Sequence, residues 1–515
     1  MKHSARMREY LQMSPFELKN ELIRAAEAKG GMLNAGRGNP NFLNTSVREA
    51  FSVLNSFASL RAGKGSDLGF RPEKKGIAKD LMKFVKGKGS AGLFLRNSVL
   101  FASKKFKLKP DDFVFDLVDA VLGDFYPSPP RILNGVDKVV NAYLCEILNV
   151  KGSFDLFATE GATAAMVYVF ASLKENRVLR KGDSIAILTP IFSPYLEIPA
   201  LADYNLVEVY VKGDENLGWQ VPDSEIAKLK DKRVKAFFMV HPTNPTSVKL
   251  KMDTLRKIAS VVKSRKDLIV LTDTVYATFV DGFDSFAGLV PHNTICVYSY
   301  SKFFGVTGWR LGVVMLHKDN VVDRLISRLS LKDKIALRKR YEMTSTAPDR
   351  IKFIDRLEMD SRDVALAHTG GLSCPQQCIM ALFSLFYLMD KKKAYKKRIQ
   401  GILKKRAVLL YKNLGVPLPK GSEHTYYYAL IDLEKVAEKK YGKKFADYLS
   451  SNVLMDEFLF RLAKEKATVC LPGEGFAGPK LSLRVSLANL NDRDYVFVGK
   501  NIAEILKKYY VEWKS

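Results

Sequence analysis

Short apolar runs recur through the middle of this chain, and the segments between them show helical spacing. Each run is almost continuously hydrophobic, which is typical of strands buried on both faces of a sheet. Between two of the runs, Leu255, Ile258 and Val262 place an apolar stripe on one face of a helix. This alternation predicts an α/β fold with a mostly parallel sheet flanked by helices. The expected strands are Phe154–Thr159, Ser184–Pro190, Leu206–Val211, Val234–Val240, Asp267–Asp273, Thr294–Ser301 and Gly312–Leu316.

Composition narrows the class of protein. Of the 515 residues, 47% are hydrophobic and 27% are charged, which describes a globular chain of two or more domains. No apolar run is long enough to span a bilayer, and the first twenty residues lack the apolar core of a secretory signal. Five cysteines show no paired metal-ligand spacing. We therefore expect reduced thiols, a cytoplasmic location, no membrane partner and no metal site.

The formal net charge of +27 raises the hypothesis of nucleic-acid binding. However, the basic residues are spread along the chain and mixed with acidic ones. The densest basic run, "DKKKAYKKRIQGILKKR", has the pattern of an amphipathic helix with a solvated lysine-rich face. No zinc-finger spacing and no aromatic RNA-binding motif appears. The charge therefore favours a basic solvated surface, with no nucleic-acid partner.

Polar groups and glycine turns follow the expected strands at their carboxyl ends, where parallel sheets bind ligands. After Phe154–Thr159, a glycine turn at Gly161 opens a helix whose first residues, Ala162 and Thr163, are small. Free N–H groups and the dipole of such a helix favour a phosphate. After the next strand, Phe192 is available to stack on a flat ring.

Further strand ends supply an amine, a carboxylate and two hydrogen-bonding groups. Lys302 follows the sixth run, Asp273 ends the fifth, and Asn244 and Tyr276 lie just beyond the fourth and fifth. An amine can hold an aldehyde cofactor, and a carboxylate can keep a pyridine nitrogen protonated. Asn244 and Tyr276 fit the oxygen of such a ring. The set therefore predicts pyridoxal 5′-phosphate held by Lys302, with its phosphate bound by Ala162, Thr163, Ser299 and Arg310. Gly161 and Ser301 are predicted to bind the cofactor as well.

Three motifs carry a resemblance to a known family. "SYSKFFGVTGWRLG", "HPTNPT" and "DTVY" resemble the fold-type I aminotransferases that use pyridoxal 5′-phosphate. The resemblance implies a seven-stranded, mostly parallel sheet flanked by helices and a smaller α+β domain built from both chain ends. It also implies that Arg484, in "LRVSLANL", binds the α-carboxylate of a small-molecule substrate.

Other segments narrow the resemblance to one branch of the family. "MSPFELKNELIRAA", "LNAGRGNPNF", "GDFYPSPPRIL" and "HTGGLSCPQQ" resemble the aspartate 4-decarboxylases. That branch implies β-decarboxylation of L-aspartate to L-alanine and carbon dioxide, with aspartate aminotransferase side activity towards 2-oxoglutarate or pyruvate. It places Arg37 at the distal carboxylate of the substrate, with Lys19 as a second candidate and with Gly36 and Asn244 beside them.

The same resemblance implies assembly and a division into domains. Tyr126 would reach the cofactor phosphate of a neighbouring subunit, and Thr369 would lie at the same shared site. A homodimer is then the minimum catalytic unit, and a larger homo-oligomer is expected. The expected parts are an N-terminal arm, part of the small domain and a helical insertion (1–109), a large cofactor-binding domain (110–329), a helical insertion returning to the large domain (330–380), and the C-terminal part of the small domain (381–515).

Two alternatives use the same sequence features. A plain aminotransferase acting on aspartate or another amino acid would need the same cofactor residues, so only its products would distinguish it. A non-enzymatic regulator with an aminotransferase-like domain would carry a DNA-binding winged helix ahead of that domain. The first hundred residues show no such segment. The decarboxylase interpretation is therefore preferred.

Overall fold

The computed structural model describes residues 15–28, 30–63, 66–201, 204–362 and 371–515. Its centre is a seven-stranded sheet with the strand order β2-β8-β7-β6-β5-β3-β4. Only β8 runs antiparallel to its neighbours, so the predicted mostly parallel sheet is confirmed. The strands are β2 (Phe154–Thr159), β3 (Ser184–Thr189), β4 (Val207–Lys212), β5 (Val234–Val240), β6 (Ile269–Asp273), β7 (Thr294–Ser299) and β8 (Gly312–His317).

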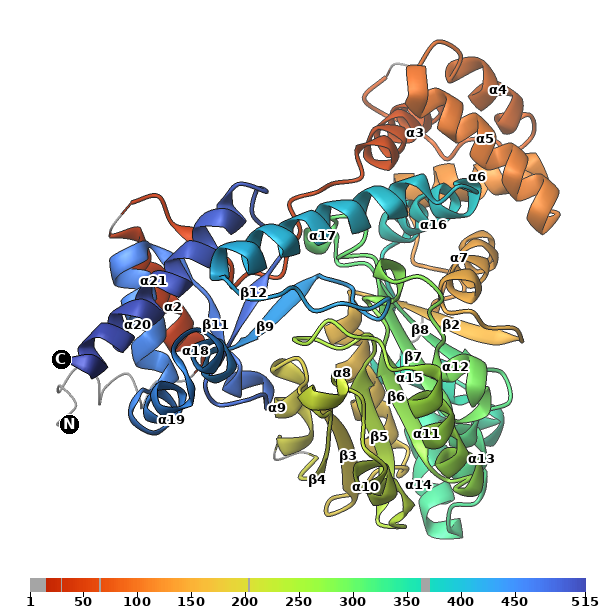
Figure 1. Cartoon of the computed structure of the whole chain (residues 1–515). Coiled ribbons are helices and arrows are strands. Elements are labelled where there is room, and N and C mark those ends of the chain that lie inside the picture. The colour runs from red at the N-terminus through yellow and green to blue at the C-terminus, as the bar shows by residue number, and fades with distance from the viewer. Residues whose placement is uncertain (1–14, 29, 64–65, 202–203, 363–370) are drawn as a thin grey trace.

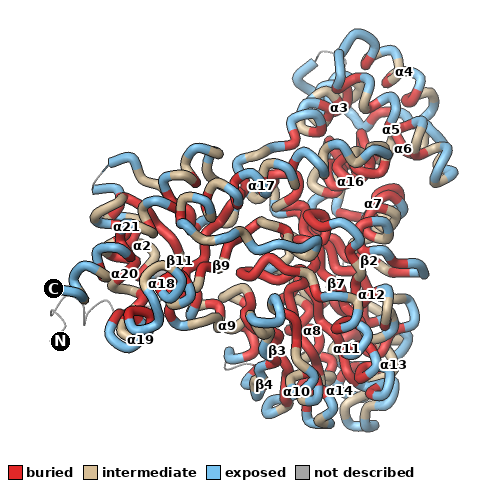
Figure 2. The backbone as a smooth tube through the Cα atoms, viewed as in Figure 1, coloured by how far each residue is buried: buried red, intermediate tan, exposed pale blue. Residues whose placement is uncertain are grey.

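Helices cover the sheet, and its central strands are buried on both faces, as their apolar runs require (Figures 1 and 2). The edge strand β4 is the exception: it pairs with β3 on one side alone, and most of its residues are exposed or half-buried. Every residue of β3, β6 and β7 is buried, which explains why these runs lack a polar alternation. The helices around the sheet are α7 (Asn134–Ile147), α8 (Ala162–Glu175), α9 (Pro194–Ala200), α10 (Asp223–Ala227), α11 (Met252–Ser264), α12 (Phe286–Leu289), α13 (Val321–Ser327), α14 (Leu331–Tyr341) and α15 (Phe353–Asp360).

The two ends of the chain meet in a second group of elements (Figure 1). Strand β1 pairs in parallel with β10, and helix α2 packs against α20. A three-stranded antiparallel sheet, β11-β12-β9, lies in the same group. The elements are α2 (Pro15–Glu27), β1 (Leu33–Asn34), α17 (Ala394–Leu414), β9 (Tyr428–Asp432), α18 (Leu433–Tyr441), α19 (Lys443–Asn452), α20 (Met455–Lys466), β10 (Thr468–Val469), β11 (Leu471–Pro472), β12 (Ser482–Ser486) and α21 (Asp494–Lys514).

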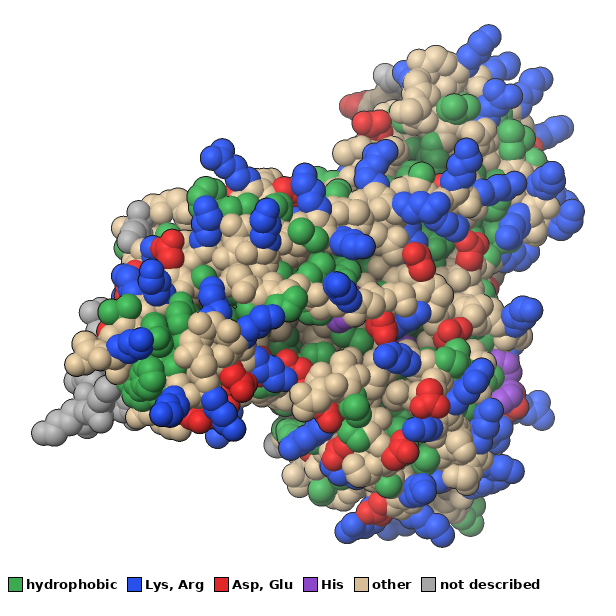
Figure 3. Space-filling model, viewed as in Figure 1, with side chains coloured by type: hydrophobic (Ala, Val, Ile, Leu, Met, Phe, Trp, Pro, Cys, Tyr) green, Lys and Arg blue, Asp and Glu red, His purple; other side chains and the backbone are tan. Residues whose placement is uncertain are grey.

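A helical arm projects beyond α16 (Figure 1). It contains α3 (Thr45–Gly63), α4 (Ile77–Phe84), α5 (Gly89–Phe106) and α6 (Pro110–Leu122), and α3 and α6 pack on α16 (Cys374–Met389). Lysine and arginine side chains are scattered over the arm and the rest of the visible face rather than gathered in one place (Figure 3). Among the described residues, none of the helices has the length and apolar character needed to cross a membrane.

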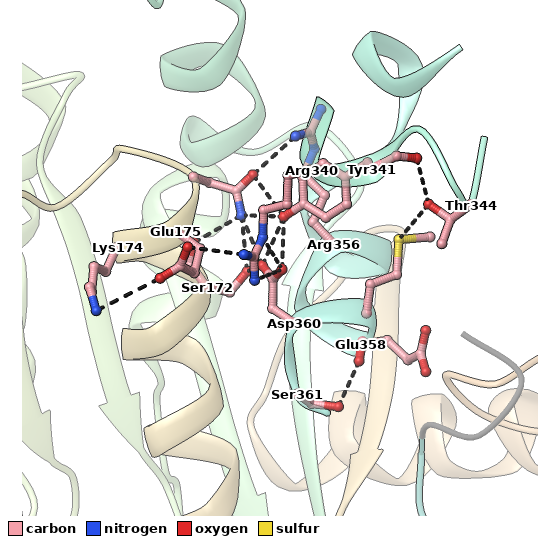
Figure 4. Close-up of polar contacts among 12 residues, drawn as sticks. Ser172, Lys174, Glu175, Arg340, Tyr341, Thr344, Arg356, Glu358, Asp360 and Ser361 are labelled. Atoms are coloured by element: carbon pink, nitrogen blue, oxygen red, sulfur yellow. Dashed lines mark hydrogen bonds and ion pairs between the residues drawn. The ribbon is translucent and has the colours of Figure 1, made fainter. Parts of the chain in front are cut away.

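A buried polar network fastens the α14–α15 segment to α8 (Figure 4). Asp360, at the end of α15, accepts hydrogen bonds from Ser172 Oγ at 2.6 Å and from Asn176 Nδ2 at 3.0 Å. The Tyr341 hydroxyl also donates to Asp360 at 2.9 Å. Arg356, only 2% exposed, donates to Asn176 Oδ1 at 3.0 Å. The network therefore fixes the C-terminal end of α8, and the N-terminal end of α8 faces the cavity described below.

Candidate active site

A cavity of about 550 Å³ lies where the carboxyl ends of the sheet strands meet the elements from both chain ends. It contains most of the side chains that the sequence predicts for one site. Those lining it are Lys19, Gly36, Arg37, Ala162, Thr163, Phe192, Asn244, Asp273, Tyr276, Ser299, Ser301, Lys302, Arg310 and Arg484.

Two described residues of the predicted set, Gly161 and Tyr126, do not line this cavity. Gly161 lies directly behind its wall, because a Cβ atom there would come within 2.5 Å of the Arg310 guanidinium. Gly161 also has a φ of 97°, so both space and backbone conformation require glycine. Tyr126 is 65% exposed and lines a separate cavity with Glu160 and Gln376. Thr369 lies outside the described residues.

Lys302 follows β7 and reaches across to the N-terminal loop. Its Nζ donates to the Gly38 carbonyl at 3.1 Å, and the Tyr427 hydroxyl donates to the same oxygen at 2.8 Å. A Cβ atom on Gly38 would lie 2.5 Å from the Tyr428 hydroxyl, so only glycine fits between the lysine and that tyrosine. The loop therefore holds the amine at the edge of the cavity.

Asp273 provides a buried carboxylate on the cavity wall. It is 4% exposed, accepts a hydrogen bond from Tyr195 Oη at 2.7 Å, and accepts another from the Val275 N–H at 3.0 Å. Burial raises the pKa of Asp273 to about 6, although these two donors and the Lys302 charge oppose the rise. A cation placed beside this carboxylate would favour its ionised form.

The part of the cavity around the start of α8 has the groups needed to bind an anion. Helix α8 starts at Ala162, and its N-cap residue Gly161 has no side chain that could cap the first N–H groups. The Thr163 hydroxyl and the Ser299, Ser301 and Arg310 side chains lie around this helix start. Arg310 has a φ of 54°, a left-handed conformation that is uncommon outside glycine. An oxyanion here would meet backbone donors, hydroxyls and a guanidinium together.

Arg484 supplies a second cationic site from β12. The side chain is 4% exposed; it donates to the Gly36 carbonyl at 2.7 Å and to Asn244 Oδ1 at 3.4 Å. Its buried Nε has no hydrogen-bond partner among the described residues. Asn244 in turn donates to Tyr276 Oη at 3.5 Å. Such a guanidinium can bind a carboxylate from a ligand through a two-pronged contact.

Several cavity residues were not predicted from the sequence. Tyr195 follows Phe192 by three residues, so its helical spacing at a strand end was a usable signal. Tyr428, by contrast, starts a strand of the small sheet, and only the tertiary fold brings it to the cavity. The other residues missed are Gly38, Asn39, Val240, Val275, Thr307 and Leu471.

The donor set fits pyridoxal 5′-phosphate. The uncapped start of α8 with Arg310 suits the phosphate, Lys302 suits the aldehyde, and the buried Asp273 suits the ring nitrogen. The unpartnered Nε of Arg484 remains for a substrate carboxylate. The fold and the cavity together define a fold-type I enzyme dependent on pyridoxal 5′-phosphate.

Comparison with known proteins gives the family. Residues 143–496 match the family described as aminotransferase class I and II. The chain is also 43% identical, over 99% of its length and 98% of the other protein, to the bifunctional aspartate aminotransferase and L-aspartate beta-decarboxylase of a Pseudomonas species. An aspartate aminotransferase of Sulfurisphaera tokodaii is 23% identical over 62% of this chain and 67% of its own length. The chain therefore belongs to the class I and II aminotransferase family, whose members act on small molecules.

Solved structures show the same fold. A double mutant of Thermus thermophilus aspartate aminotransferase superposes with a TM-score of 0.62 at 16% identity, covering 98% of this chain and 100% of that one. The aromatic aminotransferase of Pyrococcus horikoshii has a TM-score of 0.61 at 18% identity, with 96% and 99% coverage. The predicted fold class is confirmed, including the small group of elements built from both chain ends.

Proposed function

We propose that this chain converts L-aspartate to L-alanine and carbon dioxide with pyridoxal 5′-phosphate, and that it transaminates aspartate as a side reaction. The observation that carries this proposal is the 43% identity, along nearly the whole chain, to a Pseudomonas protein named for both activities. The aspartate aminotransferases among its relatives match shorter parts of the chain. 2-Oxoglutarate and pyruvate are the candidate acceptors for the side reaction.

In this proposal the strand ends hold the cofactor. Gly161, Ala162, Thr163, Ser299, Ser301 and Arg310 bind the phosphate, and Phe192 stacks on the ring. Asn244 and Tyr276 bind the ring oxygen, and Asp273 keeps a proton on the ring nitrogen. When bound, pyridoxal 5′-phosphate supplies an aldehyde for amines and a ring that withdraws electrons from the substrate. The arrangement of these groups around one cavity supports the assignment.

Lys302 is the proposed acid–base group. With the cofactor and substrate bound, the Lys302 Nζ would take the proton from the substrate Cα and later return one. Its hydrogen bond to the Gly38 carbonyl supports this role, because that bond keeps the amine in the cavity beside the N-terminal loop that carries Arg37. Asp273 assists this proton transfer electrostatically, because its buried carboxylate stabilises positive charge on the cofactor ring.

The substrate's two carboxylates would bind different arginines. We assign the α-carboxylate to Arg484, whose Nε lacks a partner among the described residues and whose guanidinium packs against two aromatic rings. We assign the distal carboxylate to Arg37, which lines the same cavity, with Gly36 and Lys19 beside it. A guanidinium that binds too tightly would oppose the loss of that carboxylate as neutral carbon dioxide. Arg37 therefore has to orient the group more than it stabilises it.

The decisive experiment is incubation of purified, cofactor-loaded protein with L-aspartate alone, followed by product NMR and carbon dioxide measurement. We expect alanine and carbon dioxide in equal amounts over many turnovers without an added keto acid. If alanine forms only when 2-oxoglutarate or pyruvate is added, the chain is a plain aminotransferase. If neither regime yields a product, an enzymatic role towards aspartate is wrong.

We further propose a homodimer as the minimum catalytic unit, a larger homo-oligomer in solution and a cytoplasmic location. Tyr126 supports the first point, because it is exposed and lies outside the Lys302 cavity of its own chain. Five free cysteines support the last point, since a reducing compartment keeps thiols unpaired.

A further inference from the structure

Tyr428 is a cavity residue to which the proposed function assigns no role. It starts β9, is 4% exposed, and its backbone N–H donates to Ser247 Oγ at 2.7 Å. In the antiparallel pair of β9 and β12, Tyr428 stands opposite Ser486, two residues from Arg484. Tyr428 and Arg484 are therefore diagonal neighbours on one face of the small sheet, where an aromatic ring and a long side chain can touch.

The ring of Tyr428 packs against the guanidinium of Arg484. The guanidinium carbon lies 4.4 Å from the centre of the Tyr428 ring and 4.6 Å from the centre of the Phe476 ring. Two aromatic rings pack against the guanidinium, and its Nε has no hydrogen-bond partner among the described residues, so its charge is available to a ligand. A carboxylate ligand would bind a guanidinium that is already oriented for a bidentate contact.

The hydroxyl of Tyr428 contacts the residues that the proposed function assigns to the cofactor. Tyr276 donates to Tyr428 Oη at 3.0 Å, and both tyrosines are buried. The same Oη lies against Gly38, whose carbonyl accepts a hydrogen bond from the Lys302 amine. A phenol can both donate and accept. When Tyr276 turns its hydrogen towards the cofactor ring oxygen, Tyr428 can therefore donate to Tyr276 in return.

We infer that Tyr428 is a positioning residue with two separable parts: its ring orients Arg484 for the substrate carboxylate, and its hydroxyl strengthens Tyr276 as a donor to the cofactor. This inference rests on the proposed function, because it adopts the roles given there to Arg484 and Tyr276. A hydrogen bond received by Tyr276 makes its own hydrogen a better donor. One side chain would then tune both substrate binding and the protonation of the cofactor–lysine linkage.

Two measurements on the cofactor-loaded protein separate the two parts. The first is the dissociation constant of succinate, a dicarboxylate that cannot react. The second is the pH midpoint of the visible absorption of the bound cofactor. Tyr428→Phe keeps the ring and removes the hydroxyl. Tyr428→Leu removes both, with Tyr428→Met as the second truncation if the leucine variant does not fold. Phe476→Leu is the matched control, because it removes the other ring over Arg484 and no hydroxyl.

The expected results differ for each variant. Tyr428→Leu and Phe476→Leu weaken succinate binding roughly 2- to 30-fold, the range for loss of one cation–aromatic contact. Tyr428→Phe leaves succinate binding close to wild type but raises the absorption midpoint by about half a pH unit, because the ring oxygen loses support for its anionic form. Phe476→Leu does not move the midpoint. In a Tyr276→Phe background, Tyr428→Phe produces no further shift, since its effect passes through Tyr276.

Unchanged succinate binding in a folded Tyr428 truncation overturns the role of the ring. An unmoved midpoint in Tyr428→Phe, or an equal shift with and without Tyr276, overturns the role of the hydroxyl. Neither measurement reads products, so these failures are distinct from a failure of the proposed function, which would appear as absence of alanine with the wild-type chain.

Discussion

Arg37 is fixed through its backbone, while its side chain stays free to meet a ligand. The carbonyls on either side of it are both occupied: Gly36 accepts from Arg484, and Gly38 accepts from Lys302. Among the described residues, no ion pair or side-chain hydrogen bond involves Arg37 itself. A guanidinium presented in this way can orient a distal carboxylate without a competing internal partner.

Replacement of Arg37 should therefore change the choice between products more than the binding of the cofactor. We expect Arg37→Ala to raise the keto-acid share of the products relative to alanine by about tenfold, which needs only about 1.4 kcal/mol of differential stabilisation. Arg37→Lys keeps the charge but loses the bidentate geometry of the guanidinium, so its product ratio should fall between those of wild type and Arg37→Ala. Product NMR during incubation with aspartate measures the ratio.

The exposed Arg328 gives a matched control, since Arg328→Ala removes the same side chain outside the cavity. An unchanged product ratio in Arg37→Ala would remove Arg37 from the decarboxylation step and leave the proposed overall reaction standing.

Residue types at strand ends could be predicted because the chemistry of the cofactor demands them. An amine, a carboxylate and a helix start with small residues are recognisable in sequence, and Lys302, Asp273 and Ala162 do meet in one cavity. Partners of these groups could not be predicted in the same way. The spacing of Tyr195 from Phe192 could place it at a strand end, but it could not pair it with Asp273, 78 positions away. Nothing in the sequence indicated the bond between Tyr276 and Tyr428 across 152 positions. Such contacts depend on how elements pack, which periodicity does not encode.

At the scale of elements, the buried strands of the large sheet were the easiest to predict, and the two-residue strands near the chain ends were the hardest. The apolar runs of β3, β6 and β7 are buried along their whole length, so their pattern is unambiguous. In contrast, β1, β10 and β11 have two residues each, and β1 pairs with β10 from the other end of the chain. Two-residue strands are too short to carry a period. The proposed division of the chain into four parts stays a prediction.

Helix α15 carries an acid that titrates near neutral pH. Glu358 is 1% exposed, and its Oε1 has no hydrogen-bond partner among the described residues. Figure 4 shows its carboxylate turned away from the Asp360 network on the same helix. Burial raises the pKa of Glu358 from its ordinary value of 4.5 to about 7; Asp355 and Asp360 add to the rise, and Arg362 and Arg131 oppose it.

This acid should make the folded state less stable as pH rises. Between pH 4.5 and about 7, the folded chain keeps a proton on Glu358 that the unfolded chain releases, so the free energy of unfolding falls with rising pH in this window. Glu358→Gln keeps the shape without the ionisation. We therefore expect its melting temperature to match wild type near pH 5 and to exceed it at pH 8.

Thermal melts at both pH values measure this difference. Glu438→Gln, at an exposed position on α18, is the control and should follow wild type throughout. Parallel pH profiles for Glu358→Gln and wild type would show that Glu358 does not titrate in this window.

At the scale of the whole molecule, the position of Tyr126 is the feature that a single chain does not explain. It is 65% exposed and lines a cavity with Glu160, Arg362 and Gln376, separate from the cavity of Lys302. The two cavities are nevertheless close in the fold, because Gln376 donates to the Trp309 carbonyl, next to Arg310. A large exposed aromatic side chain beside a site is typical of a surface that meets a partner.

Complementation between subunits tests whether Tyr126 acts in a neighbouring site. Chains with Lys302→Ala and chains with Tyr126→Ala are each expected to be strongly impaired alone. In a mixed dimer, the site with an intact Lys302 receives Tyr126 from the Lys302→Ala chain if the tyrosine acts across the interface. A refolded equimolar mixture should then recover about a quarter of wild-type activity per site, since half of the dimers are mixed and each has one complete site. Mixing Lys302→Ala with chains carrying both substitutions should recover none, because no complete site can form. If the first mixture shows only the average of its two parents, Tyr126 acts within its own chain and the shared site is wrong.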